Sequence, residues 1–426
     1  MMQAKGYLAA SALAITPVAG PLRGRVAPPG SKSITNRVLL LAALAEGRSH
    51  ITGALKSDDT KLMAEALRAM GVRITEPDAT SFTVESRGRL TAPGAPLFLG
   101  NAGTATRFLT AAAASVDGEV VVDGDEHMRR RPIGPLVEAL RSIGVDAKSV
   151  GGCPPVTIRG RGGFAGGRVA IDGSLSSQYV SAVLMAAPLA SGPVEIALTG
   201  PDIGARGYVD LTLAAMRAYG AKVEQEGAAV WKVDPGRYRA TDFHVEPDAS
   251  AATYLWAAER LTGGAIDIGA SADAFTQPDA KAHAVIARFP DMPHVIDGSQ
   301  MQDAVPTLAV LAAYNGGAVH FTGIENLRVK ECDRIHALWD GLNRIRNGLA
   351  EQDGDDLVVN GDPALAGARV DARIDAYADH RIAMSFALAG LATGGITILD
   401  PGCVAKTYPG YWDALASLGV KLTPLG

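Results

Sequence analysis

The sequence has few cysteines, few aromatic residues and no excess of basic charge, and each shortage excludes a class of protein. Its 426 residues contain only three cysteines and no CxxC pair, so neither a disulfide framework nor a structural zinc site is expected. No apolar run reaches the roughly 18 residues of a transmembrane helix, and residues 6–22 are too polar for a secretion signal. A net charge of −5 offers no basic surface for nucleic acid. We therefore expect a cytoplasmic protein that binds neither nucleic acid nor membrane.

Apolar residues and glycine are abundant instead. Hydrophobic residues make up 47% of the chain, aromatic residues only 5%, and 49 residues are glycine. The core must therefore consist mainly of Ala, Val, Leu and Ile, connected by many tight turns. A chain of this length is too long for one compact core and suits two domains of about 200 residues each.

One pattern recurs six times along the chain: a small polar loop, an Ala- and Leu-rich helical stretch, and then a glycine. The copies begin at Gly30, Gly100, Gly173, Pro247, Gly298 and Tyr377. More polar helical stretches such as MAEALRAM and LVEALRSI lie between them and lead into strands. The pattern predicts six α/β units, each with a buried first helix and a second helix that shows one face to water. A break at residues 245–248 divides the copies three and three, and the shortest spacing, between the fourth and fifth copies, makes the second half less regular.

Small polar residues stand at the entry of these buried helices. Ser, Asn, Thr and Asp at such positions accept hydrogen bonds from the free N–H groups of the first helical turn. Six buried helix N-termini that open from polar loops would form a concentration of dipoles that favours anions. Ordinary helix caps in an Ala-rich protein are the alternative interpretation, but six copies followed in several cases by Lys or Arg favour an anion site.

Four loops are more specific than the repeat. They are GSKSITNR at 30–37, LGNAGTATR at 99–107, RVKECDR at 328–334 and YADHR at 377–381. The first lacks the spaced upstream glycine of a Walker A loop. The third, taken alone, is also typical of a solvated helix face.

Together and in this order, the four loops resemble the 5-enolpyruvylshikimate-3-phosphate synthase family. RPIG at 131–134, DGSLSSQ at 172–178 and AKT at 405–407 match its patterns too, and the similarity extends from about residue 15 to the C-terminus. The resemblance implies an α/β fold of two domains, each an inside-out barrel of three βαβαββ units around buried helices. It also implies a first domain at residues 30–246 on the shikimate 3-phosphate side, a second at 1–29 plus 247–426, and an active site in the cleft between them.

The reaction implied is transfer of the enolpyruvyl group of phosphoenolpyruvate to the 5-hydroxyl of shikimate 3-phosphate, with release of phosphate. In the family this addition–elimination passes through a tetrahedral intermediate, serves aromatic amino acid biosynthesis and is inhibited by glyphosate. The two substrates are strongly anionic, and two like charges ~5 Å apart repel by roughly 3 kcal/mol at an effective dielectric of about 20. A site for both must therefore supply fixed cations. The resemblance implies no metal, no cofactor and a monomer.

The family motifs assign site residues position by position. Those assigned to phosphoenolpyruvate are Lys32, Asn101, Gly103, Arg131, Gln178, Arg334, Arg381 and Lys406, with Asn101 and Gly103 acting through backbone N–H groups. Those assigned to shikimate 3-phosphate are Lys32, Ser33, Arg37, Ser176, Ser177, Gln178, Tyr208, Asp303, Asn326 and Lys330. Asp303 matches the base at the 5-hydroxyl, while Glu331 and Lys32 match groups that carry protons on the enolpyruvyl side. Which group moves which proton stays open.

Several positions depart from the family pattern; one of them, Pro278 in place of a common glycine, lies in a region not assigned to the site. Phe108 stands where many members have proline, and Ala205 stands where a serine is usual. The Ala205 change removes one hydroxyl contact to the shikimate phosphate, so we expect weaker binding rather than lost function.

Two alternative functions share this architecture. One is UDP-N-acetylglucosamine enolpyruvyl transferase, whose cysteine loop Cys153 superficially resembles; the surrounding residues do not match, and we interpret Cys153 as a surface-turn residue. The other is a non-catalytic anion-binding relative, against which the intact Lys32, Asp303, Glu331 and Lys406 argue. His380 is expected to orient its neighbours in the Asp-His-Arg loop rather than to act as the base.

Overall fold

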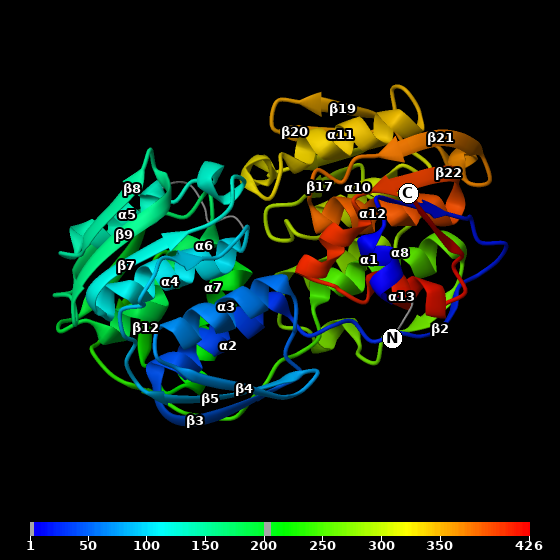
Figure 1. Cartoon of the computed structure of the whole chain (residues 1–426). Coiled ribbons are helices and arrows are strands. Elements are labelled where there is room, and N and C mark those ends of the chain that lie inside the picture. The colour runs from blue at the N-terminus through cyan, green and yellow to red at the C-terminus, as the bar shows by residue number, and fades with distance from the viewer. Residues whose placement is uncertain (1–3, 200–205) are drawn as a thin grey trace. The chain divides into compact units, whose positions relative to one another are not determined.

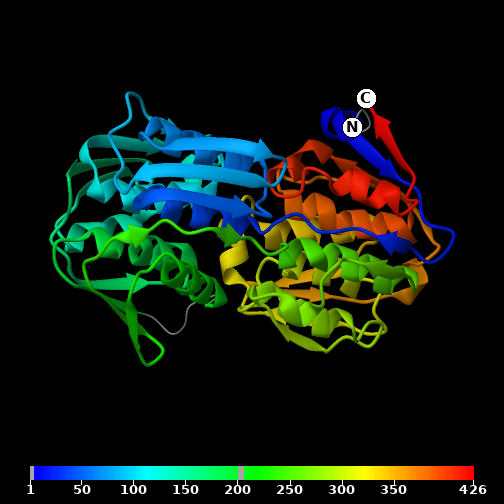
Figure 2. The same cartoon turned by 90° about the horizontal axis from the view of Figure 1, so that it is seen from below.

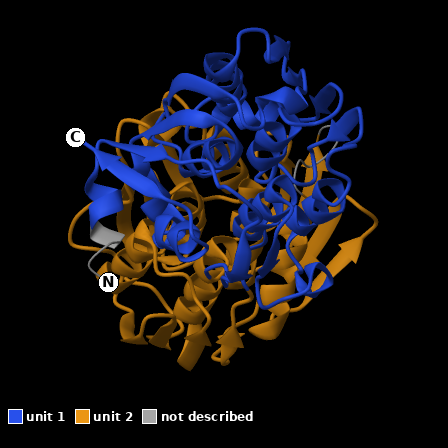
Figure 3. Ribbon diagram, turned by 90° about the vertical axis from the view of Figure 1, so that its right-hand side faces the viewer, with its two compact units in different colours: residues 1–29, 247–426 blue, residues 30–246 orange. Residues whose placement is uncertain are grey.

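The chain folds into two compact units in the computed structural model, which describes residues 4–199 and 206–426. Unit 1 consists of residues 1–29 and 247–426, and unit 2 of residues 30–246 (Figure 3). The chain therefore passes between the units twice, at Pro29–Gly30 and at Glu246–Pro247. Each unit has a hydrophobic core of its own.

Unit 2 contains three sheets, each of which combines a parallel strand pair with an antiparallel hairpin. Their strand orders are β6-β7-β9-β8, β10-β11-β13-β12 and β14-β3-β5-β4, with β15 also paired with β3. The strands are β3 (Ala45–Thr52), β4 (Arg73–Asp78), β5 (Ser81–Arg87), β6 (Leu97–Phe98), β7 (Asp117–Asp123), β8 (Asp146–Val150), β9 (Cys153–Arg161), β10 (Gly167–Asp172), β11 (Val194–Thr199), β12 (Val223–Glu226), β13 (Val230–Val233), β14 (Tyr238–Arg239) and β15 (Phe243–His244). The blue strands β3, β4 and β5 lie side by side in Figures 1 and 2. Because β14 comes from the end of the unit and β3 from its beginning, the third sheet joins the two ends of unit 2.

The helices of unit 2 connect these strands in the βαβαββ order. They are α2 (Lys32–Leu44), α3 (Asp58–Ala69), α4 (Gly103–Ala112), α5 (Gly134–Ser142), α6 (Ser177–Ala186) and α7 (Gly207–Ala218). The second sheet, for example, follows the order β10, α6, β11, α7, β12, β13. The parallel strand pair at the start of each βαβαββ repeat needs a helical crossover, whereas the last two strands of the repeat need only a tight turn.

Unit 1 repeats this arrangement less completely. Its sheets have the orders β17-β18-β20-β19, β21-β22-β1-β23 and β16-β2. The strands are β1 (Ala12–Ile15), β2 (Arg23–Arg25), β16 (Ala265–Asp267), β17 (Val295–Asp297), β18 (Val319–Thr322), β19 (Ala350–Asp353), β20 (Asp356–Val359), β21 (Arg369–Ile374), β22 (Gly394–Leu399) and β23 (Leu422–Leu425). The β16-β2 sheet belongs to the fourth copy of the sequence repeat and has only two strands. The expectation that the second half is less regular is confirmed.

The helices of unit 1 include three that match the buried helices of unit 2. The helices of unit 1 are α1 (Ala4–Ala9), α8 (Ala249–Thr262), α9 (Ala282–Ile286), α10 (Val305–Ala312), α11 (Arg334–Ile345), α12 (His380–Ala392) and α13 (Tyr411–Ser417), and the three that match are α8, α10 and α12. Strand β1 lies between β22 and the C-terminal β23, so the two ends of the chain meet in one sheet of unit 1.

The Ala- and Leu-rich helices are buried as predicted. All ten residues of α4 and all eight of α10 are buried, whereas α3 and α11 bury one face and expose the other. Within unit 2, α4 packs against α6 and α2; within unit 1, α8 and α10 pack against α12. Small Ala side chains allow these helices to approach one another closely. None of the helices in the described ranges is both long and apolar enough to cross a membrane.

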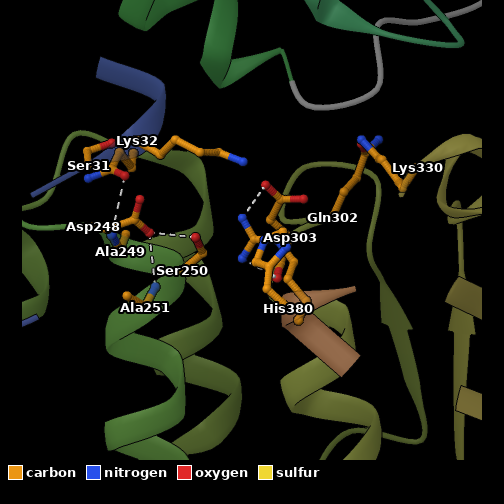
Figure 4. Close-up of polar contacts among 12 residues, drawn as sticks. Ser31, Lys32, Asp248, Ala249, Ser250, Ala251, Gln302, Asp303, Lys330 and His380 are labelled. Carbon is orange, nitrogen blue, oxygen red and sulfur yellow. Dashed lines mark hydrogen bonds and ion pairs between the residues drawn. The ribbon is translucent and has the colours of Figure 1, made fainter. Parts of the chain in front are cut away.

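The expected helix caps are present on four of the six buried helices. Ser31, Ser176, Asp248 and Asp379 each accept a hydrogen bond from a first-turn N–H of α2, α6, α8 and α12, respectively. Figure 4 shows the cap of α8, where Asp248 accepts from Ser250 and Ala251. The expectation was wrong for the other two, because α4 and α10 begin after Ala102 and Ala304, which carry no side-chain acceptor.

Candidate active site

Arg334 is the centre of a buried charge network in unit 1. Its guanidinium contacts three carboxylates: Nη1 lies 3.1 Å from Oδ1 of Asp303, Nη2 2.7 Å from Oε2 of Glu331, and Nε 2.7 Å from Oδ2 of Asp379. Burial alone would lower the pKa of Arg334, but Asp379, Glu331 and Asp303 together raise it above its usual range. Arg334 is therefore a permanent cation.

Two further cations continue the network. Nη2 of Arg381 lies 2.7 Å from Oδ2 of Asp303, and Nζ of Lys406 lies 3.0 Å from Oε1 of Glu331. Positive and negative groups thus alternate in the order Lys406, Glu331, Arg334, Asp303 and Arg381. The backbone N–H of Arg381 donates to Oδ1 of Asp379, so one carboxylate caps α12 and also holds Arg334.

Except for Lys406, each of these side chains lies at the start of a helix or in the loop before one. Asp303 precedes α10, and Glu331 follows the 3₁₀ helix η6 (Glu325–Val329). Lys406 ends another 3₁₀ helix, η8 (Pro401–Lys406). Beside Asp303, Nζ of Lys330 lies 3.4 Å from Oε1 of Gln302 (Figure 4). Asn326 in η6 is buried, and its Oδ1 accepts no hydrogen bond from any described residue.

Unit 2 holds a second set of cations near the start of α2 and α4. Nζ of Lys32 lies 3.3 Å from Oδ2 of the buried Asp59, and Nη1 of Arg131 donates to Oδ1 of Asn101 at 3.0 Å. Arg107 donates to the carbonyls of Gly103 and Pro132, which ties the start of α4 to the loop that carries Arg131.

Arg37 is a buried cation with no acidic partner among the residues that the structure describes. None of its contacts with the described residues involves a carboxylate: it donates to the hydroxyls of Thr212 (2.7 Å) and Ser181 (3.3 Å) and to the carbonyls of Ser33 and Tyr208. Burial lowers the pKa of Arg37 to about 10, which leaves it charged at neutral pH. An uncompensated buried charge is costly unless an anionic ligand pairs with it.

The Phe108 departure has a structural explanation. The fully buried ring of Phe108 lies beneath Arg37, with the guanidinium carbon 5.2 Å from the ring centroid. Tyr208 places its ring 5.8 Å from the same carbon. Both rings present a π face that favours a cation. Ala205, another departure, lies outside the described residues.

The remaining assigned residues of unit 2 lie at the start of α6. Ser176 caps this helix, Ser177 is buried in its first turn, and Oε1 of Gln178 is buried without a hydrogen-bond donor among the described residues. Ser33 and Tyr208 are half-buried at the starts of α2 and α7. The starts of α2, α4 and α6 thus carry most of the residues assigned to substrates in unit 2.

One expected contact takes a different form. The N–H of Gly103 donates to the carbonyl of Asn101 at 3.0 Å within the loop, so in this structure that amide is already engaged. The tight turn of residues 101–103 imposes this, because it brings the carbonyl of one residue over the N–H two positions later.

Sequence reasoning missed several partners of the assigned residues. Asp59 was not singled out, because Ser57-Asp58-Asp59 has the composition of an ordinary helix start. Thr212 and Ser181, which hold Arg37, lie on α7 and α6 as small polar residues among apolar ones. A buried polar residue within an otherwise apolar helix face is the signal that could have identified them.

The cysteines and His380 are buried or half-buried. Cys153 lies half-buried at the turn between β8 and β9, and burial raises the pKa of both Cys332 and Cys403. His380 is fully buried, with Nδ1 3.7 Å from Oδ1 of Asp379. No cluster of His, Cys, Asp and Glu suited to a metal ion occurs in residues 4–199 and 206–426.

Comparison with known proteins decides the family. Residues 18–415 match the family model described as EPSP synthase (3-phosphoshikimate 1-carboxyvinyltransferase). The chain belongs to the EPSP synthase family. A protein of Rhizobium leguminosarum bv. trifolii named 3-phosphoshikimate 1-carboxyvinyltransferase is 69% identical over 408 residues, which cover 96% of this chain and 97% of that protein. A protein of the same name from Pseudomonas syringae pv. syringae is 68% identical over 410 residues, with 96% and 98% covered.

A solved structure supports the same family. EPSP synthase from Acinetobacter baumannii matches with a TM-score of 0.78 and 26% identity, over 97% of this chain and all of that one. The predicted fold class, an α/β architecture of βαβαββ units around buried helices, is confirmed. The substrate and proton roles of the individual residues stay predictions.

Proposed function

We propose that this chain transfers the enolpyruvyl group of phosphoenolpyruvate to the 5-hydroxyl of shikimate 3-phosphate and releases phosphate. One observation supports this beyond family membership: Asp303 and Glu331 both pair with the buried Arg334, within a set that includes Arg381 and Lys406. In a protein that only bound anions, these carboxylates would do no more than offset the repulsion between neighbouring cations. An enzyme that must bind anions and also move protons needs both.

The cations of unit 1 would hold the phosphate and carboxylate of phosphoenolpyruvate. Arg334 and Arg381 offer planar forks that suit two parallel hydrogen bonds to either group. Their present partner, Asp303, keeps the two guanidinium groups from repelling each other before substrate arrives. As the ester C–O bond breaks, the same cations and Lys406 would stabilise the charge on the departing phosphate.

Asp303 would accept the proton of the 5-hydroxyl as the hydroxyl oxygen attacks C2 of phosphoenolpyruvate. Its side chain is about one-fifth exposed, so it is accessible to a substrate, whereas the Asp379 side chain is fully buried and serves structure. Glu331, together with Lys32 of unit 2, would deliver a proton to C3 and later remove one. Loss of phosphate from the tetrahedral intermediate then restores the double bond.

Unit 2 would bind shikimate 3-phosphate. Arg37, which has no carboxylate partner in residues 4–199 and 206–426, suits an anionic group of this substrate, and the hydroxyls of Ser33, Ser176 and Ser177 suit its phosphate. Gln178 and Tyr208 from unit 2, with Asn326 and Lys330 from unit 1, complete the proposed set. Both charge clusters would therefore act on one pair of substrates. No metal or cofactor is needed for this chemistry, and we expect a monomer that acts in the cytoplasm.

Phosphate release from phosphoenolpyruvate tests the proposal. Purified protein should release phosphate when shikimate 3-phosphate is present, and none when it is omitted or replaced by UDP-N-acetylglucosamine. Phosphate release only when UDP-N-acetylglucosamine is the acceptor would identify a UDP-N-acetylglucosamine enolpyruvyl transferase. Binding of both anions without any release would identify a non-catalytic relative.

A further inference from the structure

The N-terminal helix α1 packs against the 3₁₀ helix η8, which ends in Lys406. Tyr7 and Leu8 are half-buried against the core of unit 1. The carbonyl oxygen of Leu8 comes so close to Gly402 that a Cβ added there would lie only 2.6 Å from it. The two segments therefore meet backbone to backbone. The family match begins at residue 18, so α1 lies outside the matched region.

The η8 helix depends on such contacts. A 3₁₀ helix has poorly aligned hydrogen bonds and is seldom stable by itself. Here the backbone N–H of Asp400 donates to the carbonyl of Ser11 at 3.0 Å, and the indole N–H of Trp412 donates to the carbonyl of Pro401 at 2.9 Å. Residues 8–11 and Trp412 thus both contact the first turn of η8, while Lys406 is its last residue.

A small displacement of Lys406 would change its contact with Glu331 in the charge network. Its Nζ is 3.0 Å from Glu331, which in turn lies 2.7 Å from Arg334. A displacement of about 1 Å in a site can cost on the order of a hundredfold in rate. We propose that α1 is a positioning element of the active site: Tyr7 and Leu8 hold η8 so that Lys406 keeps its place beside Glu331. This inference rests on the role in phosphoenolpyruvate binding proposed for Lys406.

The first experiment compares the variant Tyr7→Ala/Leu8→Ala with Leu261→Ala, which truncates a half-buried leucine of the same core in the last turn of α8. The double variant should raise KM for phosphoenolpyruvate by about five- to twentyfold, leave KM for shikimate 3-phosphate unchanged, and accelerate amide hydrogen exchange in residues 401–406. The control should change none of these. Leu8→Met, which keeps an apolar side chain of similar volume, should preserve wild-type values. If the double variant folds poorly, Leu8→Ala alone gives the same comparison with a smaller effect.

A double-mutant cycle with Lys406→Met completes the test. If α1 acts through Lys406, the Tyr7 and Leu8 substitutions should add no further loss in the Lys406→Met background. Additive losses, or unchanged exchange in residues 401–406, would overturn the inference. A normal KM in Lys406→Met alone would instead refute the role proposed for Lys406, and the exchange data would still show whether α1 holds η8.

Discussion

The carboxylate of Asp303 accepts hydrogen bonds from two arginines at once: Oδ2 lies 2.7 Å from Nη2 of Arg381, and Oδ1 lies 3.1 Å from Nη1 of Arg334. Both arginines are almost completely buried. Two guanidinium groups this close would repel each other, so the shared carboxylate stabilises the empty site. In the proposed reaction the same carboxylate accepts a proton from the 5-hydroxyl, which gives Asp303 a structural and a chemical role.

Asp303→Asn tests the chemical role of this side chain. The amide keeps the size of the side chain but loses the negative charge that the two arginines share and cannot take up the proton, so turnover should fall by about 10²–10⁴-fold. KM for shikimate 3-phosphate should change little, because its phosphate contacts are assigned to serines of unit 2. Asp297→Asn, an exposed position in β17, is the matched control. Near-normal turnover in Asp303→Asn, measured by phosphate release, would show that Asp303 is not the base.

Arg37→Met should weaken the binding of shikimate 3-phosphate without lowering the stability of the protein. Arg37 contacts no carboxylate in the described part of the chain, so its removal relieves its desolvation, and Thr212 still donates to Ser181 at 2.8 Å. The melting temperature should therefore stay the same or rise. KM for shikimate 3-phosphate should increase by at least about tenfold, since a charge-assisted hydrogen bond contributes roughly 1.5–3 kcal/mol.

Arg217→Met, an exposed arginine in the last turn of α7, is the control for both measurements. It should alter neither the melting temperature nor KM. A clear loss of stability in Arg37→Met with unchanged KM would mean that Arg37 serves the fold alone.

Gly103→Ala should weaken the binding of glyphosate more than the binding of phosphoenolpyruvate. A methyl group at this position would lie 2.6 Å from Nη1 of Arg107 and 2.9 Å from both Nη atoms of Arg131, so both side chains must shift. Glyphosate is longer than phosphoenolpyruvate and needs more of this space. Its inhibition constant should rise by about ten- to a hundredfold, and KM for phosphoenolpyruvate by less. Gly94→Ala, where a Cβ meets no atom within 4 Å, is the control; equal losses for inhibitor and substrate in Gly103→Ala would contradict the assignment of Gly103 to the shared site.

The three cysteines should react with a thiol reagent in a defined order. Burial, with a further contribution from Asp379, raises the pKa of Cys332, and burial raises that of Cys403. Both thiols should stay protonated at pH 8, so iodoacetamide should modify Cys153 first. Mass spectrometry should show this order in the native protein and lose it in urea. Activity that falls in step with Cys153 modification would point to the cysteine-dependent alternative.

The fold class was predictable because the six buried helices have a sequence pattern of their own. Residues such as those of α10, apolar on every side, can only be accommodated within a core. The two-stranded sheet of β2 and β16 was not predictable in detail. Its strands lie far apart in the sequence, and each has only three residues, too few for a period-of-two pattern.

The candidate site was predictable only for residues within motifs. Lys32, Arg37 and Arg334 stand in distinctive loops, but their partners Asp59, Thr212 and Asp379 acquire meaning through tertiary contacts. Asp379 was visible in the Asp-His-Arg loop, yet its bond to Arg334 depends on how α11 and α12 pack. The position of α1 against η8 has no motif at all, because a backbone contact at Gly402 leaves no side-chain signature.

The most direct measurement is the reaction run in D₂O, with mass analysis of the product. Addition delivers a deuteron to C3 of phosphoenolpyruvate, and elimination then removes one of the three hydrogens of the resulting methyl group. The addition–elimination mechanism predicts deuterium in the enolpyruvyl group of the product, and neither exchange nor phosphate release when shikimate 3-phosphate is omitted. Product that forms without deuterium at C3, or phosphate release that proceeds without shikimate 3-phosphate, would contradict it.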